Sequence, residues 1–174
     1  MISGILDLER IQTGLLKIEN CKPVSIVGKV IEELRPLAND KNIELQVKIG
    51  NPVSEFRGDT EQFKRALVNL TENALKFTPN NGKVQICVEN GDNNNIIFQI
   101  KDTGVGIPIS QQSQVFDRFF RAEQKAIKHI TGTGLGLSLV KTVVENHEGN
   151  VWFESEEGVG TTFFVSIPVA VKDT

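Results

Sequence analysis

The chain has 174 residues, of which 39% are hydrophobic and 24% are charged. This composition excludes an intrinsically disordered chain and is sufficient for one hydrophobic core, with or without an appendage. The 19 basic and 22 acidic residues give a net charge of -3. That balance argues against a nucleic-acid partner held by a basic surface, but it does not argue against a small polyanion.

The two cysteines, Cys21 and Cys87, are far apart and form no CxxC pair. They are typical of reduced structural cysteines in a cytosolic protein, and not of a disulfide framework or a zinc site. No apolar run approaches the ~20 residues that a membrane-spanning helix requires, and the N-terminus lacks a signal-peptide pattern. We therefore expect a soluble, cytoplasmic chain that makes no membrane contact.

The first half of the chain alternates between helical and extended patterns. Apolar residues at spacings of three and four predict a helix over residues 1–16, with more apolar surface than it could bury alone. Residues 16–19 are expected to form a strand, and residues 26–37 carry the apolar stripe of a second helix. Residues 41–49 alternate apolar and polar side chains, which predicts a half-buried strand.

The third predicted helix has the clearest start signal. Asp59 precedes it and Gln62 follows three residues later, which predicts a capping box before an apolar stripe that extends to Ala74. Pro79 and the Asn81-Gly82 pair end the helix and turn the chain.

In the second half of the chain, the sequence predicts two pairs of strands, separated by a long connection and a helix. The strands are expected at 84–88 and 96–101, then at 151–154 and 161–168, with a helix from Leu135 to about residue 149. Residues 104–132 show a helical period only around 115–120, and a connection of this length is typical of a lid. These elements predict an α/β (α+β) two-layer sandwich, with a mixed, mostly antiparallel sheet, helices on one face and a long lid.

The common phosphate-binding and hydrolase motifs are absent. The sequence contains no GxxxxGK[ST], Rossmann glycine spacing, GxSxG or HExxH. His129 and His147 are too isolated for a metal cluster or a protease triad. Four other motifs carry the chemistry.

The first motif is a polar stripe on the third helix. Asn69, Asn73 and Lys76 stand at i, i+4 and i+7 and share one helix face. A carboxamide oxygen can bind Mg²⁺ without adding negative charge, and Lys adds a cation for phosphate. The alternative is an exposed helix face with a Glu72–Lys76 ion pair.

The second motif follows a strand directly and contains Asp102, Gly104, Gly106 and Ile107. A carboxylate accepts a hydrogen bond from the exocyclic amino group of adenine, where guanine presents a carbonyl. The glycines allow a base to approach the backbone. The alternative is a plain Asx-Gly turn.

The last two motifs flank the second half of the lid. Phe116, Phe119 and Phe120 are expected to anchor the loop, and Arg121 could reach a terminal phosphate. Residues 132–138, Gly-Thr-Gly-Leu-Gly-Leu-Ser, open a helix whose N–H groups and dipole favour an anion. The alternatives are a hydrophobic cluster under the loop and a helix-capping glycine run.

In this order and at these separations, the four motifs resemble the N, G1, F and G2 boxes of the ATP-binding catalytic domain of sensor histidine kinases, over about residues 20–168. The resemblance implies the Bergerat-type fold shared with gyrase, chaperone and mismatch-repair ATPases, with ATP and Mg²⁺ as cofactors. It also implies transfer of the ATP γ-phosphoryl group to a histidine on a separate dimerisation domain, in two-component signal transduction. The implied site residues are Asn73 as the Mg²⁺ ligand; Asn69, Lys76 and Arg121 as catalytic, phosphate-side groups; Asp102, Gly104, Gly106 and Thr161 at the adenine; Gly132, Gly134, Leu135 and Gly136 at the phosphates; and Ile107, Phe120, Thr133 and Leu137 as further ATP contacts.

The resemblance also implies a division of the chain. Residues 1–16 are similar to the end of the dimerisation and phosphotransfer hairpin, and residues 17–174 to the catalytic domain. Neither His129 nor His147 matches the phosphoacceptor. The implied partners are the chain's own dimerisation domain and a response regulator, within a homodimeric parent whose isolated fragment is a monomer. The small departures from the family pattern are Glu148, where a second Gly is common, and the Asn80-Asn81 pair.

Position 69 discriminates between two enzyme classes. The hydrolytic members of the superfamily resemble one another in placing a Glu four residues before the Mg²⁺-binding Asn, whereas this chain has Asn69, which cannot take a proton from water. We therefore expect ATP to be held until an acceptor imidazole arrives. Glu72 is the nearby carboxylate that could weaken this argument. The alternatives are a nucleotide-gated interaction module and an anti-sigma serine kinase.

Overall fold

The computed structural model describes residues 5, 9, 11, 13 and 15–169. Most of the helix expected over residues 1–16 lies outside them, although Ile5, Glu9 and Ile11 are helical. The described elements are the strands β1 (Glu19–Cys21), β2 (Glu44–Ile49), β3 (Phe56–Gly58), β4 (Lys83–Asn90), β5 (Asn95–Asp102), β6 (Asn150–Glu156) and β7 (Gly160–Pro168); the helices α2 (Pro23–Asp40), α3 (Thr60–Phe77) and α4 (Gly136–Asn146); and the 3-10 turns η1 (Ile109–Gln114) and η2 (Lys125–Ile127).

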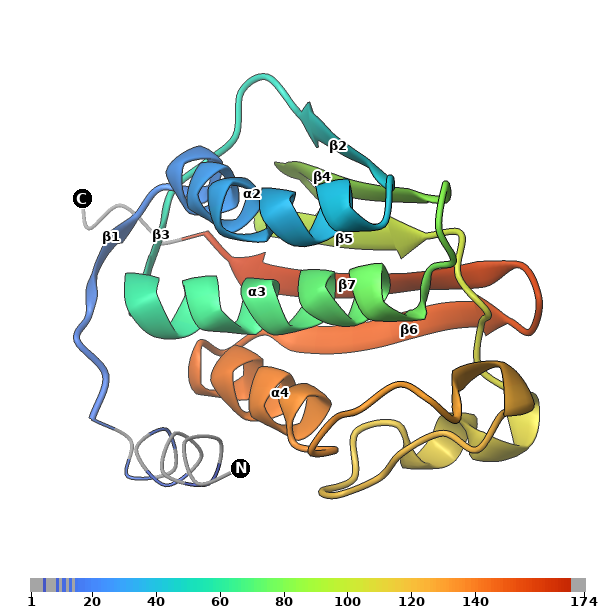
Figure 1. Cartoon of the computed structure of the whole chain (residues 1–174). Helices are drawn as coiled ribbons and strands as arrows, with labels where there is room; N and C mark the ends of the chain where they lie inside the picture. The colour runs from blue at the N-terminus through green and yellow to red at the C-terminus, as the bar shows by residue number, and fades with distance from the viewer. Residues whose placement is uncertain (1–4, 6–8, 10, 12, 14, 170–174) are drawn as a thin grey trace, which may run out of the picture.

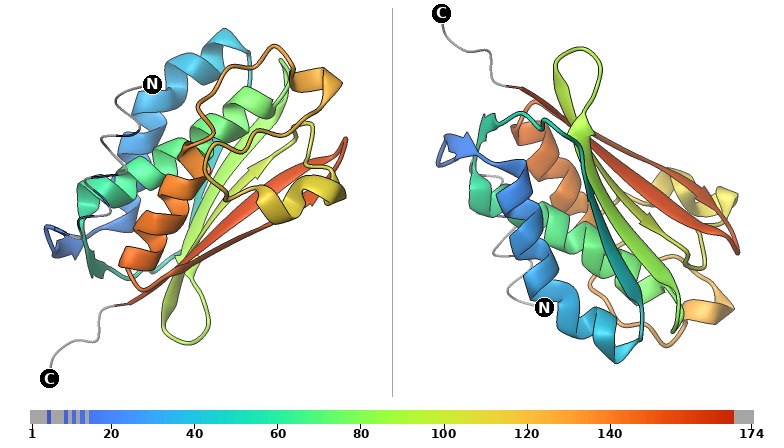
Figure 2. Two further views of the ribbon diagram at one scale, coloured as in Figure 1. Left: turned by 90° about the horizontal axis from the view of Figure 1, so that it is seen from below. Right: turned by 90° about the horizontal axis from the view of Figure 1, so that it is seen from above.

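The elements form two layers. A five-stranded sheet has the order β2-β4-β5-β7-β6, in which only the β2–β4 pair is parallel. The helices α2, α3 and α4 lie side by side over one face of this sheet, and the long lid extends beside them (Figures 1 and 2). This arrangement confirms the predicted two-layer fold with its mostly antiparallel sheet.

The hydrophobic core lies between the two layers. Inward-facing side chains meet in register across the central strands, where Ile86 is opposite Ile100 and Ile100 is opposite Phe163. The apolar stripe of α3 covers them, and its Phe63 and Leu70 are fully buried. Burial of such a side chain contributes roughly 1.5–3 kcal/mol, so the stripe fixes α3 firmly on the sheet.

The start of α3 differs from the predicted capping box. The Asp59 Oδ1 atom accepts a hydrogen bond from the Gln62 amide at 3.0 Å, as expected of an N-cap. The reciprocal bond from the Gln62 side chain is absent, because the Asp59 amide donates to His147 Nε2 at 2.9 Å. The predicted box is therefore only half correct.

Two extended segments were assigned wrongly. The strand expected at residues 16–19 begins instead at Glu19, and it pairs with β3, which the sequence patterns did not predict. Both strands have three residues, too few to show a period of two. The helical period at residues 115–120 of the lid does not correspond to a helix. The helical turns of the lid are the 3-10 turns η1 and η2, which lie before and after these residues.

Glu148 occupies a backbone conformation that favours glycine. It follows the C-cap of α4 with φ at 58°, in the left-handed region. We expect Glu148→Gly to raise the free energy of unfolding by about 1 kcal/mol, because a side chain there is strained. Glu145→Gly inside α4 should lower it by a similar amount. Urea unfolding of both variants tests this pair, and an unchanged or lower stability of Glu148→Gly would contradict it.

Candidate functional site

A cavity of about 730 Å³ lies between α3, the end of β5, the lid and the start of α4. It brings together residues from all four sequence motifs, which span residues 69–138. The predicted site residues in its wall are Asn69, Asn73, Lys76, Asp102, Gly106, Ile107, Phe120, Arg121, Gly132, Thr133, Gly134, Leu135, Gly136, Leu137 and Thr161. Gly104, which was predicted to lie at the adenine, is not in the wall, and a Cβ atom there would lie 2.6 Å from the Phe77 carbonyl oxygen.

The polar stripe of α3 forms one wall of the cavity. Asn69, Asn73 and Lys76 all line it, on the helix face beside the buried apolar stripe. The Lys76 ammonium lies 3.4 Å from a Glu72 carboxylate oxygen, so the ion pair of the alternative interpretation is present. The two interpretations are compatible, because both side chains also face the cavity.

Asp102 is a buried residue in the wall of the cavity, at the last position of β5. Its Oδ1 accepts hydrogen bonds from the Gly104 amide at 2.8 Å and from the Thr161 amide at 3.2 Å. Within the described residues, no hydrogen bond engages Oδ2. Burial raises the pKa of this carboxyl to about 6, although the two backbone hydrogen bonds oppose the shift. The structure therefore fixes Asp102 through one oxygen and leaves the other as an acceptor.

The raised pKa of Asp102 predicts a pH dependence of binding. The pKa is about 6 in the folded chain, so protonation at lower pH removes the carboxylate acceptor, and the affinity for adenosine should fall. Adenosine is the suitable ligand because it has no phosphate that titrates in this range. An NMR titration above and below this pKa tests the effect, and an affinity that does not change would contradict it.

The Gly104–Ile107 segment passes very close to the β6–β7 turn. Gly106 has φ at +69°, and a Cβ atom there would lie 2.0 Å from the Glu156 carbonyl oxygen. The Ile107 amide donates to Ser155 Oγ at 2.8 Å, and this hydroxyl also lies 2.7 Å from Thr161 Oγ1. The beginning of the lid is therefore held against the same strands that position Asp102.

The lid is anchored by two of its three phenylalanines. Phe116 packs against Phe153 and Phe163, with ring centroids 5.9 and 6.2 Å apart, and Phe120 packs on the core and lines the cavity. Phe119 is 65% exposed, so the prediction that all three anchor the loop holds for only two of them.

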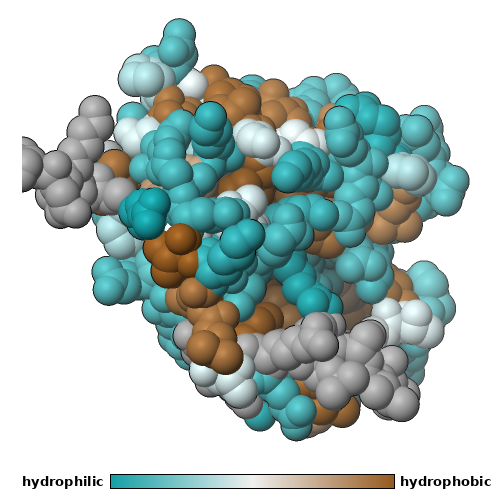
Figure 3. Space-filling view, turned by 90° about the vertical axis from the view of Figure 1, so that its left-hand side faces the viewer, coloured by the Kyte–Doolittle hydropathy of each residue, from teal (hydrophilic) through white to brown (hydrophobic). Residues whose placement is uncertain are grey.

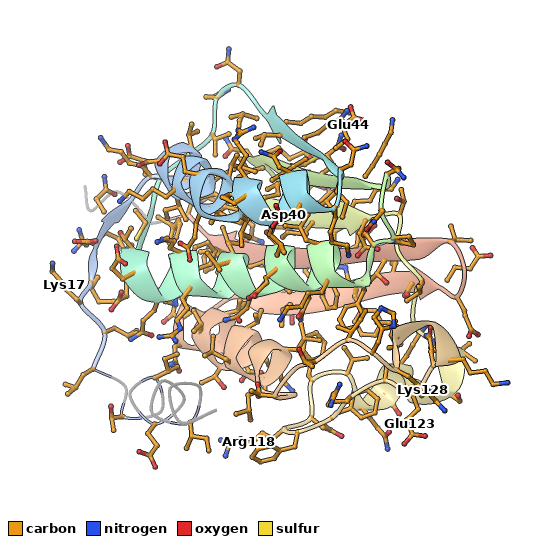
Figure 4. The ribbon with its side chains drawn as sticks, in the orientation of Figure 1. Lys17, Asp40, Glu44, Arg118, Glu123 and Lys128 are labelled. Carbon is orange, nitrogen blue, oxygen red and sulfur yellow. The ribbon has the colours of Figure 1, made fainter. Side chains whose placement is uncertain are left out.

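Polar contacts complete the lid's attachment. The Arg121 guanidinium donates to the Ile130 carbonyl and lines the cavity. The Gln111 side chain pairs with the backbone of Glu123 through two hydrogen bonds, of 3.1 and 2.8 Å. Among the lid's charged side chains, Glu123 and Lys128 lie at the lower right of the molecule, and Arg118 lies at the bottom near the centre (Figure 4).

The beginning of α4 faces the polar stripe of α3. A Cβ atom at Gly136 would lie 3.4 Å from Asn69 Oδ1, so the two helices approach closely at this end. The first hydrogen bond of α4 runs from the Leu139 amide to the Leu135 carbonyl. In the part of the chain that is described, no acceptor engages the amides of residues 136–138. These amides and the helix dipole make this end of the cavity suitable for an anion.

Sequence reasoning missed some residues that shape the site. Ser155 and Gln112 hold the start of the lid, and the Gln112 side chain donates from Nε2 to the Ile107 and Ser155 carbonyls. Their role depends on contacts between segments distant in sequence, so no local pattern could have indicated them. Arg65, which lines the cavity beside Asn69, was detectable because it lies four residues earlier on the same helix face.

The side-chain oxygens in the cavity wall suit Mg²⁺ bound together with a nucleotide. They do not suit a metal ion whose ligands all come from protein side chains. Among residues 5, 9, 11, 13 and 15–169, no three His, Cys, Asp or Glu side chains are close enough to hold a metal ion. Asn73 and Asn69 provide neutral oxygen donors beside the candidate anion site. Mg²⁺ commonly takes few protein ligands and completes its shell with phosphate oxygens and water. Separately, none of the described helices is long and apolar enough to cross a membrane.

Comparison with known proteins identifies the family. Residues 58–171 match the family described as histidine kinase-, DNA gyrase B-, and HSP90-like ATPases. Because this match covers more than half of the chain, the chain belongs to that family.

The relatives within this family include sensor kinases. The circadian input-output histidine kinase CikA of Synechococcus elongatus is 37% identical over 174 residues, which is 97% of this chain and 23% of CikA. The sensor protein kinase WalK of Staphylococcus haemolyticus is 32% identical over 148 residues, which is 84% of this chain and 24% of WalK. The chain thus spans about a quarter of the length of these relatives.

Solved structures agree with this assignment. The catalytic domain of the histidine kinase ThkA has a TM-score of 0.75 at 26% identity, covering 87% of this chain and 97% of that one. Full-length ShkA in complex with AMPPNP has a TM-score of 0.83 and covers 99% of this chain and 36% of ShkA; at 24% identity, it shows likeness of fold alone. Together these findings confirm the resemblance to the ATP-binding domain of sensor histidine kinases.

Proposed function

We propose that this chain is the ATP-binding catalytic domain of a sensor histidine kinase, and that it transfers the γ-phosphoryl group of ATP to a histidine on a separate dimerisation domain. The observation that carries the proposal is a single cavity with a buried carboxylate at one end and a helix N-terminus beside a carboxamide stripe at the other. These are the groups that an adenine and a polyphosphate chain require.

The proposal assigns a role to each end of the cavity. Asp102 Oδ2 accepts a hydrogen bond from the adenine amino group, while Gly106 and Ile107 border the base. The amides of residues 136–138 and the side chains of Lys76 and Arg121 bind the phosphates. Arg121 must exchange its bond to the Ile130 carbonyl for a phosphate oxygen, which it can do as the lid closes.

Asn73 is the proposed Mg²⁺ ligand, with Asn69 beside it on the phosphate side. When bound, the ion neutralises the charge that develops on the transferred phosphoryl group. The chain's own contribution is to orient the phosphates between α3 and α4 and to exclude water beneath the lid.

Transfer is favoured over hydrolysis because the position that faces the terminal phosphate carries no base. Asn69 cannot accept a proton, and its Nδ2 donates to the Arg65 carbonyl at 3.1 Å. Glu72 is paired with Lys76 in this structure. The bound ATP therefore stays intact until an acceptor histidine enters the site and its ring nitrogen attacks the γ-phosphorus.

A second hollow supports the entry of an external acceptor. This groove, of about 510 Å³, runs over the exposed face of α3, and it shares Arg65, Asn69 and Glu72 with the nucleotide cavity. At another point it is lined by Ile11, from the N-terminal segment. The phosphate end of the cavity is thus open toward the segment that we propose ends the dimerisation hairpin.

The parent protein's partners follow from the proposed class. We propose residues 1–16 as the end of the dimerisation and phosphotransfer hairpin and residues 17–174 as the catalytic domain, within a homodimeric parent that phosphorylates a response regulator. We also propose a cytoplasmic location, since that compartment supplies ATP.

The isolated chain is expected to bind Mg-ATP without labelling itself. Calorimetric titration should show binding that weakens when Mg²⁺ is chelated, and incubation with [γ-³²P]ATP should leave the protein unlabelled. Glu72→Gln should leave any slow hydrolysis unchanged, because Glu72 is not a base in this account. Stable self-labelling, or hydrolysis that disappears in Glu72→Gln, would contradict the proposal.

A further inference from the structure

We propose that His147 is a positioning residue for the phosphate end of the nucleotide site, acting through α4. The inference rests on the proposed function, and it adds a residue that no sequence motif assigns to the site. His147 lies at the C-terminal end of α4, at the end of the helix opposite to the candidate phosphate-binding amides.

The His147 ring joins α4 to the beginning of α3. Its Nε2 accepts the Asp59 amide at 2.9 Å, and its Nδ1 lies 2.7 Å from the Val143 carbonyl oxygen. An atom that accepts from an N–H carries no proton, so the ring is neutral, with its proton on Nδ1 directed at Val143. Asp59 in turn caps α3 through its side chain, so one residue links the ends of two helices.

The surroundings of the ring leave it no alternative position. His147 is 6% exposed, and a Cβ atom at Gly58 would lie 2.4 Å from its Cδ2. The rings of Phe56 and Phe63 contact it edge-on, with centroids 6.3 and 5.7 Å away. This junction lies at the β1–β3 end of the molecule, where the surface is mostly hydrophilic with smaller hydrophobic patches (Figure 3).

The N-terminal segment of the chain contacts the same junction, where His147 joins the end of α4 to the start of α3. The Lys17 amide donates to Asp59 Oδ2 at 3.0 Å, and the Asn146 side chain donates to the Ile11 carbonyl at 3.2 Å. Lys17 marks this linker at the left edge of Figure 4. The junction therefore joins the ends of α3 and α4 to the segment that precedes the domain.

Both helices run from this junction to the nucleotide cavity. The 11 residues of α4 span roughly 16 Å. No proline interrupts the helix, so a tilt at one end is transmitted to the other. At its other end, Gly136 approaches Asn69. We call the two hydrogen bonds of the His147 ring, to Asp59 and Val143, the His147 clamp. This clamp fixes the angle of α4 on α3, and with it the distance between the phosphate-binding amides and the Asn69–Asn73 stripe.

The adenine end does not depend on this clamp. Asp102 belongs to β5 and is fixed by the backbone of Gly104 and Thr161. Loosening α4 should consequently weaken contacts to the phosphates while it spares contacts to the base. This difference separates positioning from general structural support.

The test compares Mg-ATP with adenosine as ligands of the full chain. In His147→Phe, which keeps the ring volume but loses the acceptor, we expect the affinity for Mg-ATP to fall about tenfold, equivalent to about 1.4 kcal/mol. The affinity for adenosine should stay within about twofold, which is within the usual error of such a comparison. His147→Gln restores an acceptor and should recover most of the affinity for Mg-ATP. Gly58→Ala, which displaces the ring, provides a second variant if His147→Phe does not fold.

Asn73→Ala in the same assay distinguishes two failures. If Asn73→Ala weakens Mg-ATP binding but His147→Phe and Gly58→Ala do not, the inference is overturned and the proposed function stands. Equal losses for Mg-ATP and adenosine in His147→Phe, without rescue by His147→Gln, overturn the inference as well. If Asn73→Ala has no effect on Mg-ATP, the proposed site itself is wrong.

Discussion

Asp102→Asn should abolish ATP binding and leave the fold intact. Asp102 Oδ1 already accepts two backbone N–H groups, from Gly104 and Thr161. An asparagine must place its NH₂ group either against these two donors or against the adenine amino group, so two donors meet in both orientations. We expect an affinity lower by about a hundredfold or more, because a buried charge-assisted hydrogen bond becomes a repulsive contact.

The stability of this variant provides the control. Since the pKa of Asp102 is raised to about 6, the stabilisation by this group is fully present below the ordinary Asp value and is lost as the pH rises through about 6. At neutral pH, the neutral side chain of Asp102→Asn should therefore not lower the melting temperature. Asp40→Asn, at the exposed end of α2 (Figure 4), should change neither property. Unchanged ATP affinity in Asp102→Asn would contradict the site assignment.

Gly134→Ala should have the second largest effect. Gly134 has φ at +72°, and a Cβ atom there would lie 2.6 Å from the Phe119 carbonyl carbon. The Gly134 carbonyl also accepts the Phe119 amide at 2.9 Å. The substitution therefore strains the backbone and separates the lid from the start of α4. We expect the affinity for Mg-ATP to fall by more than about tenfold, because the left-handed conformation alone costs about 1–2 kcal/mol.

Gly28→Ala, on the exposed face of α2 and outside the cavity wall, is the control for the same type of substitution. A Cβ atom at Gly28 meets nothing within 4 Å, so the affinity should change by no more than about twofold. Calorimetric titration of both variants measures the difference. An equal loss of Mg-ATP affinity in the two variants would show that binding does not depend on the close contact between Gly134 and Phe119.

Much of the fold could be predicted from the sequence because its main elements are amphipathic and long. The stripe on α3 and the alternation in β4, β5 and β7 each repeat several times, and each buries one face. The short strands β1 and β3 contain no such repeat. They form because they pair with each other, and a partner 35 to 39 residues away leaves no local pattern.

The candidate site was predictable to the extent that its chemistry lies in contiguous motifs. The motifs at 69–76, 102–107 and 132–138 all contribute residues to the wall of one cavity. They could not reveal that Asp102 presents a single available oxygen, or that Gln111 and Arg121 attach the lid to carbonyl and amide groups of the loop itself. Side chain to backbone contacts of this kind have no period and no preferred spacing.

His147 shows the same limit most clearly. In the sequence, it is a single histidine near the end of a helix, with no partner nearby. In the structure, its partner is the backbone of Asp59, 88 residues earlier, and it replaces half of a predicted capping box. A backbone amide is present at every residue except proline, so the sequence could not indicate which one the ring would accept from.

Phosphoryl transfer in trans tests the central claim most directly. The chain is mixed with a separately prepared acceptor-hairpin fragment and [γ-³²P]ATP, and the labelled product is treated with acid and with base. We predict that the hairpin becomes labelled, and that the label is acid-labile and base-stable, as phosphohistidine is. The label should be absent when the Asn73→Ala or Asp102→Asn variant replaces the chain. Release of inorganic phosphate without labelled hairpin, or an acid-stable phosphoserine product, would contradict it.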